Sequence, residues 1–64
     1  MKEVTLYNKK TKETRILTDR KDGFTDIGII NRKGVGSKSI GFNLIEHMVE
    51  HYKSKGYTVE HEIE

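Results

Sequence analysis

The stretch RKGVGSKS, residues Arg32–Ser39, decides how the second half of this 64-residue chain is arranged. It contains two glycines and two serines, follows the apolar segment FTDIGII (24–30), and precedes an apolar run that begins at Phe42. Glycine permits tight turns, and serine is a favoured first residue of a helix. The stretch therefore predicts a loop that leads from a β-strand into the N-terminus of a helix.

The following residues, 42–55, have the apolar periodicity of one amphipathic helix. Six apolar residues fall on one side at 100° per residue: Phe42, Leu44, Ile45, Met48, Val49 and Tyr52. Ser37 or Ser39 can cap the helix, and Asn43 with Glu46 offers a competing capping box one turn later. Gly56 ends the helix, after two lysines that suit the negative end of its dipole.

Four segments alternate between apolar and polar residues, as strands do. They are KEVTLYN (2–8), ETRILT (13–18), FTDIGII (24–30) and YTVEHEIE (57–64), the last with Tyr57, Val59, His61 and Ile63 facing inward. The pair Asp22-Gly23 predicts a turn between the second and third strands. The order β-β-β-α-β predicts a small α+β fold, with one helix packed on a sheet of three to four strands. The last strand pairs with either the first or the third.

Length and composition limit the class of protein. Sixty-four residues form a single domain, 1–64, that buries a small core. Without cysteine there is no disulfide framework, and no apolar stretch has the length of a signal sequence or a membrane span. With apolar residues at only 33%, a second copy can help to complete the core, so we expect a cytoplasmic monomer or homodimer without a cofactor.

Charge is unevenly distributed, with basic residues dominating up to Lys38 and acidic residues thereafter. If the first three strands form a meander, the turn at 8–12 and the glycine stretch lie at the same end, next to the positive end of the helix dipole. This arrangement predicts an anion-binding or nucleic-acid-binding site at Lys9, Lys10, Lys12, Arg32, Lys33, Gly34, Gly36 and Lys38.

Two short motifs resemble those of enzymes but are too incomplete to predict an enzymatic activity. When a Walker A motif is aligned on Lys38 and Ser39, both required glycine positions hold other residues, Arg32 and Ser37. The pentapeptide HMVEH (47–51) resembles the H-x-x-E-H motif of the inverted zinc metallopeptidases over those five residues only.

That second resemblance implies zinc ligation by His47 and His51. His61 on the inward face of the last strand is a conceivable third ligand. We expect partly exposed histidines that hold no metal, because only thirteen residues follow His51 and the resemblance covers nothing else.

The sequence favours a function in binding and not in catalysis. The first hypothesis is a small regulatory or inhibitory module that binds a protein, with Glu60, Glu62 and Glu64 facing a basic partner surface or protecting an edge strand. The alternative is a nucleic-acid-binding protein that uses the basic end, with Tyr7 and Arg15 as sheet-face contacts.

Overall fold

The first three strands form where the alternating pattern predicts them. The computed structural model describes residues 2–41 and 43–64, and contains β1 (Glu3–Asn8), β2 (Glu13–Asp19) and β3 (Thr25–Ile30) as a meander. Val4 pairs with Leu17 and Leu17 with Ile27, so the alternation of each strand places these side chains on one face. All three are at most 5% exposed and belong to the core.

The stretch after Ile30 forms a hairpin and not the entry to a helix. The Asn31 side-chain oxygen accepts hydrogen bonds from the backbone N–H groups of Lys33, at 2.9 Å, and Val35, at 3.0 Å. Gly34 has a φ of +83°, a conformation that closes the turn and that glycine adopts without strain. The chain then runs back beside β3 as β4 (Gly36–Gly41), so the predicted caps at Ser37 and Ser39 are wrong.

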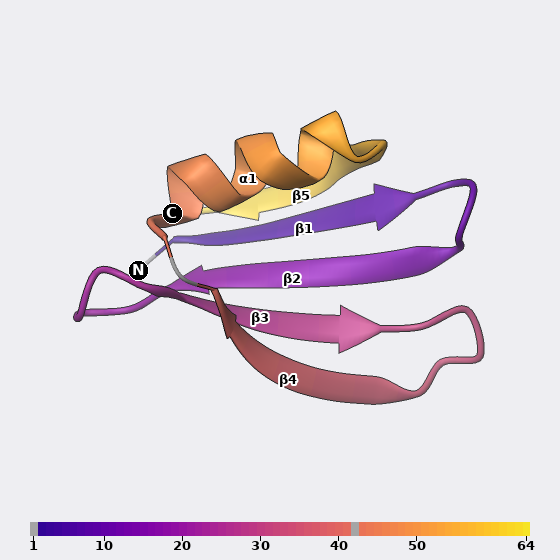
Figure 1. The fold of residues 1–64 in the computed structure, drawn as a ribbon, viewed down its shortest axis with the longest axis horizontal. Helices are drawn as coiled ribbons and strands as arrows, with labels where there is room; N and C mark the ends of the chain where they lie inside the picture. Colours follow the sequence, from indigo (N-terminus) through magenta and orange to yellow (C-terminus); the bar gives the residue numbers. More distant parts are fainter. Residues whose placement is uncertain (1, 42) are drawn as a thin grey trace.

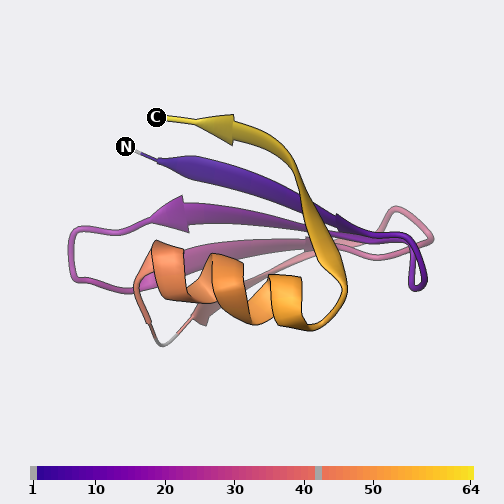
Figure 2. The same ribbon diagram turned by 90° about the horizontal axis from the view of Figure 1, so that it is seen from above.

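Five strands therefore make up the sheet, where the sequence predicted three to four. Their order is β4-β3-β2-β1-β5, with every neighbouring pair antiparallel, and β5 (Tyr57–Ile63) joins the first strand (Figure 1). The α+β class and the single helix are confirmed, and the element order becomes β-β-β-β-α-β. The ends of the chain lie side by side (Figure 2), because Glu3 pairs with Ile63.

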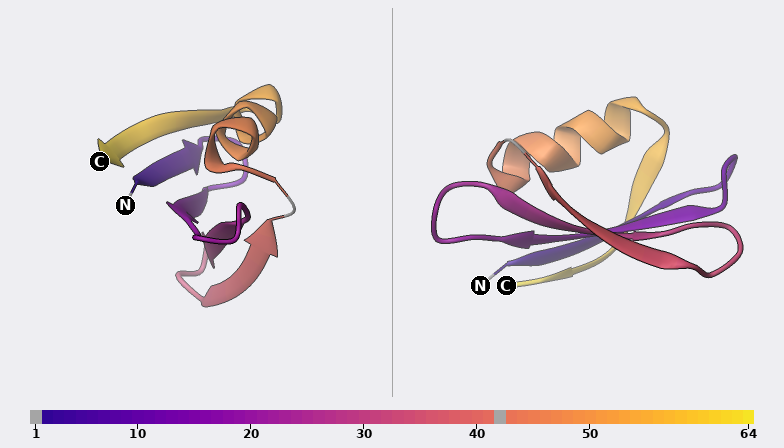
Figure 3. Two further views of the ribbon diagram at one scale, coloured as in Figure 1. Left: turned by 90° about the vertical axis from the view of Figure 1, so that its left-hand side faces the viewer. Right: turned by 60° about the horizontal axis from the view of Figure 1, so that its bottom comes forward.

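The helix α1 (Ile45–Ser54) lies across one face of the sheet, as both views of Figure 3 show. It begins later than predicted: Leu44 occupies the N-cap position, no side chain caps it, and Phe42 is outside the described residues. Gly41 allows the helix to approach closely, because a Cβ there would lie 3.1 Å from Met48 Cε. The buried apolar core consists of Val4, Leu6, Leu17, Ile27, Ile45, Met48 and Tyr57.

A β-bulge changes the direction of the side chains in the last strand. Val59 pairs with Leu6, but His61 pairs with Thr5, so two steps along β5 match one step along β1. His61 and Ile63 consequently lie on the face opposite the helix. The predicted inward face of this strand is wrong beyond Val59, and only Tyr57 of the strand is buried.

Because of β4, the helix runs in the direction opposite to that predicted. Its first turn lies beside the 20–24 turn, where Thr25 Oγ1 donates a hydrogen bond of 2.8 Å to the Asn43 carbonyl oxygen. Its last turn lies beside the 9–12 turn, where Asn8 Nδ2 donates a hydrogen bond to the Lys55 carbonyl oxygen at 3.3 Å. The glycine stretch thus shares an end of the molecule with the C-terminus of the helix and not with its N-terminus.

Candidate functional site

Cations from three separate segments gather at one end of the molecule. Two hairpin turns, 9–12 and 31–35, and the last turn of α1 with Lys55 all lie at this end (Figure 1). We call it the basic end and define it by its seven exposed side chains, Lys9, Lys10, Lys12, Arg32, Lys33, Lys53 and Lys55. The two hairpin tips are about two strand spacings, or roughly 10 Å, apart.

Most of these cations have no acidic neighbour. Within the described residues, the basic end has one ion pair, between Lys53 Nζ and Glu50 Oε2 at 3.8 Å. Glu13, a second carboxylate of this half, lies 3.8 Å from Arg15 and accepts a hydrogen bond from the Tyr57 hydroxyl at 3.4 Å. The charge of the turn lysines is therefore available to an anionic partner.

A hollow of about 500 Å³ lies between the first hairpin tip and the end of the helix. Lys9, Lys10 and Lys55 are among the residues that line it. Helix carbonyls carry partial negative charge at this end, so Lys53 and Lys55 offset the dipole. The three turn lysines and the two cations of the second tip are not needed for that purpose.

The opposite end of the molecule is acidic. Seven carboxylates lie there, Glu3, Asp19, Asp22, Asp26, Glu46, Glu62 and Glu64, against the cations Lys2, Arg20 and Lys21. The sequence predicted an imbalance between the two halves of the chain, and the fold converts it into an imbalance between the two ends of the molecule.

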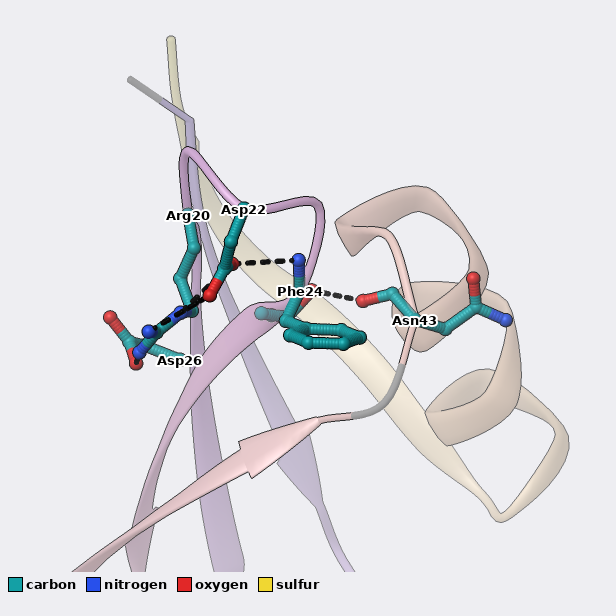
Figure 4. A network of polar contacts seen from close by, with 6 residues as sticks. Arg20, Asp22, Phe24, Asp26 and Asn43 are labelled. Atoms are coloured by element: carbon teal, nitrogen blue, oxygen red, sulfur yellow. Dashed lines mark hydrogen bonds and ion pairs between the residues drawn. The ribbon is translucent and has the colours of Figure 1, made fainter.

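Arg20 is held by the carboxylates of this acidic end (Figure 4). Its guanidinium lies 3.0 Å from Asp22 and 2.8 Å from Asp26, and Asp22 also accepts a hydrogen bond from the Phe24 backbone. These contacts raise the pKa of Arg20, and the Arg20 guanidinium in turn lowers the pKa of Asp22. The network stabilises the 20–24 turn and removes Arg20 from the set of free cations.

The structure divides the predicted anion site. Lys9, Lys10, Lys12, Arg32, Lys33 and Gly34 share one end, as expected, and Lys53 and Lys55 join them. The sequence shows both of these lysines, but only the direction of the helix reveals that they belong to the group. Gly36 begins β4, and Lys38 lies at the middle of that strand opposite Gly28, away from the turn.

Arg15 is not a sheet-face contact. It lies on the helix side of β2, with its guanidinium carbon 5.7 Å from the ring centre of Tyr52 and 5.4 Å from that of Tyr57. Its side chain is 15% exposed. The predicted position of Arg15 on the exposed sheet face is therefore wrong, whereas Tyr7 does lie on that face.

The face of the sheet opposite α1, which we call the open face, is not covered by any described segment (Figure 3). The strand registers place fifteen residues on it: Glu3, Thr5, Tyr7, Thr14, Ile16, Thr18, Asp26, Gly28, Ile30, Gly36, Lys38, Ile40, Thr58, His61 and Ile63. On the three central strands only Glu3 and Asp26 are charged, and both lie at the acidic end. In a chain with 34% charged residues, the centre of this face is notably uncharged.

The open face also has a hollow of about 390 Å³. Ile16, Gly28 and Lys38 are among the residues that line it, and the missing side chain of Gly28 leaves the space between the other two. A Cβ at Gly28 would lie 3.6 Å from Ile16 Cβ, an ordinary contact. Glycine is thus not required there by the fold.

The three histidines do not form a group. His47 and His51 are on the exposed side of α1, His47 with its Nδ1 atom 2.8 Å from Asn43 Oδ1, whereas the bulge turns His61 to the open face. In residues 2–41 and 43–64, no cluster of three His, Cys, Asp or Glu side chains could hold a metal ion. The three-histidine site conceived from the sequence is therefore wrong.

The three glutamates of the last strand do not form one row. Glu60 lies at the bulge, Glu62 pairs with Val4 on the helix side, and Glu64 follows the end of the strand. All three are exposed at the β5 edge of the sheet. A bulge and charges at this edge hinder pairing with another strand.

Comparisons with known proteins add no relative to this description. No protein-family model, curated protein or solved structure matches the chain. Among the helices of the described residues, none is long and apolar enough to cross a membrane.

Proposed function

We propose that this protein is a non-enzymatic binding module and that its basic end binds the phosphate backbone of a nucleic acid duplex. The observation that carries the proposal is the gathering of seven exposed cations, from two hairpin tips and the end of α1, at one end of the molecule. Phosphate contacts by lysine and arginine supply most of the affinity in binding that does not depend on sequence.

The composition of the basic end favours phosphate over an acidic protein surface. Six of its seven cations are lysines, which are depleted from protein interfaces relative to arginine and the aromatic residues. A single strand would need exposed aromatic rings for base stacking. At this end Tyr57 is buried and Tyr52 packs against the core, which leaves the half-buried Tyr7 on the open face, so a duplex fits better.

The test is the salt dependence of binding to a labelled DNA duplex without defined sequence. We expect log K to fall linearly with log salt concentration, with a slope of about −0.9 for each phosphate contacted. Removing one cation from each hairpin tip, in Lys10→Gln/Lys33→Gln, should make the slope shallower by about two contacts.

The matched control removes two cations from the acidic end, in Lys2→Gln/Lys21→Gln, with the same change in net charge. This control should leave the slope unchanged. Equal effects of the two double variants, or no binding at low salt, would overturn the proposal.

A protein-binding module is the second candidate, and the open face is the observation that favours it. A sheet face that is exposed to water usually bears polar and charged side chains. This face has an uncharged centre of Thr, Ile, Tyr and Gly. Ile30, Ile40 and Ile63 are exposed on it by 36%, 59% and 47%.

Photo-crosslinking in the native cell tests this second candidate. A benzophenone amino acid at Thr14, on the open face, should give a discrete protein adduct, and the same residue at Glu46, on the exposed side of α1, should not. No adduct at Thr14, or the same adducts from both positions, would exclude this surface.

A further inference from the structure

We propose that the partner of the open face is a second copy of this chain. The two open faces pack against each other, and each strand runs in the direction opposite to the same strand of the other copy. This inference rests on the second candidate above, a protein that binds through the open face. It rests on different residues from the nucleic-acid proposal, because none of the seven cations of the basic end is among the fifteen residues of the open face.

The core is small and leaves apolar side chains uncovered. Seven large apolar side chains are buried, and in the described residues seven others are exposed: Phe24, Ile30, Val35, Ile40, Leu44, Val59 and Ile63. Three of these, Ile30, Ile40 and Ile63, share the open face with the half-buried Ile16 and Tyr7. A second copy would cover all five at once.

The area of the open face is just large enough for a specific interface. Five strands about 4.8 Å apart, with six residues of about 3.4 Å each, give a face of roughly 400 to 500 Å². Two such faces bury about 1,000 Å², which is the lower limit for a specific interface. The dimer is therefore weak and dissociates on dilution.

Charge complementarity selects the relative orientation of the two copies. When equivalent strands of the two copies run in opposite directions, the basic end of one copy lies against the acidic end of the other. If they ran in the same direction, the two basic ends would come together. Like charges across an interface are costly, and opposite charges fix its register. Within the open face, the acidic residues Glu3 and Asp26 lie at the acidic end and so follow the same polarity.

The edges of the sheet form a competing route to a dimer. The β5 edge has a bulge and three glutamates, but β4 is exposed from Gly36 to Ile40 and has neither acid nor bulge. Pairing of two β4 strands would leave the open face exposed, so the test must separate the two modes.

Analytical ultracentrifugation from about 10 µM to about 1 mM, the range of a weak interface, measures the association. We expect a monomer–dimer equilibrium. Gly28→Lys and Thr5→Lys each place a cation in the central row of the open face, where Thr5 pairs with Ile16 and Ile16 with Gly28, and should raise the dimer Kd at least about tenfold. Ser37→Lys places the same charge on the helix side of β4 and should change it less than about twofold.

A thermal melt of each variant checks that it folds. With two open-face variants, the test still holds if one of them does not fold. A monomer at every concentration would overturn the inference. So would a dimer that survives both open-face variants and is lost in Ser37→Lys, since it would pair through β4. If the chain is monomeric and the photo-crosslinker at Thr14 gives an adduct heavier than a dimer of this chain, the open face binds a different protein and the second copy is excluded.

The orientation has its own test, a carbodiimide that joins lysine to carboxylate without a spacer. Within one copy the two ends are separated by a strand length of about 20 Å. Linkage of Lys9 or Lys10 to Asp22 or Glu64 therefore has to cross between copies, and we expect it in the covalent dimer. A covalent dimer linked only within like ends would overturn the antiparallel arrangement.

Discussion

At the scale of single residues, close approach and burial determine where substitutions matter. Gly36 begins β4 and Gly41 ends it, yet their surroundings differ. A Cβ at Gly41 would meet Ile27 Cδ1 and Met48 Cε at 3.1 Å, whereas a Cβ at Gly36 would meet only the Ile29 carbonyl oxygen at 3.7 Å. The first position is part of the contact between helix and sheet, and the second is at the surface.

Gly41→Ala should therefore destabilise the fold, because the added methyl forces the helix and Ile27 apart. We expect a loss of about 1 to 3 kcal/mol in urea denaturation. Gly36→Ala is the matched control and should remain within about 0.5 kcal/mol of the native chain. Similar losses for the two variants would show that helix contact is not the cause.

Tyr57 gives the chain a dependence on alkaline pH. Burial raises the pKa of its hydroxyl, with the nearby Glu13 carboxylate adding to the effect and Arg15 opposing it. The folded state thus favours the neutral phenol. This stability is fully present below the unfolded pKa near 10.0 and is lost as pH rises through the higher folded value.

Urea denaturation at pH values from about 8 to about 11 measures this effect. The free energy of unfolding of the native chain should fall more steeply above pH 10 than that of Tyr57→Phe, which keeps the ring but has no titrating group. Parallel pH profiles for the two chains would contradict the proposed linkage.

At the scale of elements, the β3–β4 hairpin is the feature on which the arrangement depends. Its turn repeats the backbone pattern of the preceding one: Gly34 N–H donates to the Asn31 carbonyl as Gly23 N–H donates to that of Arg20. The Asn31 side chain adds two further hydrogen bonds from backbone N–H groups. The turn thereby directs the chain back along β3.

Asn31→Ala should loosen this hairpin by about 1 kcal/mol, because both N–H groups lose their side-chain acceptor. Amide hydrogen exchange should show reduced protection in β4 and little change in β1. Arg32→Ala, in the same turn, serves as the control. Equal loss of protection in every strand would mean that the turn acts only through global stability.

At the scale of the whole molecule, a small core and a charge separation define the protein. A chain of this length has a stability of roughly 3 to 10 kcal/mol. Its seven buried apolar side chains all lie between one helix and one sheet face, so each represents a large share of that stability. The charges, in contrast, lie at the two ends, where they stabilise the fold little and orient partners.

Leu17→Ala tests the share of the core, because Leu17 is fully buried in the central strand. We expect a loss of about 2 to 4 kcal/mol from the cavity and the lost burial. Ile16→Ala, on the open face, should cost less when measured at a concentration where the chain is monomeric. Equal losses would show that the open face is already covered in a single chain.

The amino-acid sequence by itself determines β1, β2, β3, the amphipathic helix and its end at Gly56, because alternation, helical periodicity and glycine act over a few residues. It also determines the α+β class and the two loops that bear basic residues, at 8–12 and 32–39. The turn at Asn31 has a local signal as well. Gly34 lies three residues after Asn31, just as Gly23 lies three residues after Arg20 in the preceding turn.

Only the tertiary structure decides the rest. The segment 36–41 has neither alternation nor β-branched residues before Ile40, and it becomes a strand because β3 offers a free edge for its backbone. The bulge near Glu60 depends on the register with β1. These are pairings between distant residues, and each reverses an orientation: β4 reverses the helix, and the bulge reverses His61 and Ile63. The basic end and the open face therefore become visible only in the folded chain.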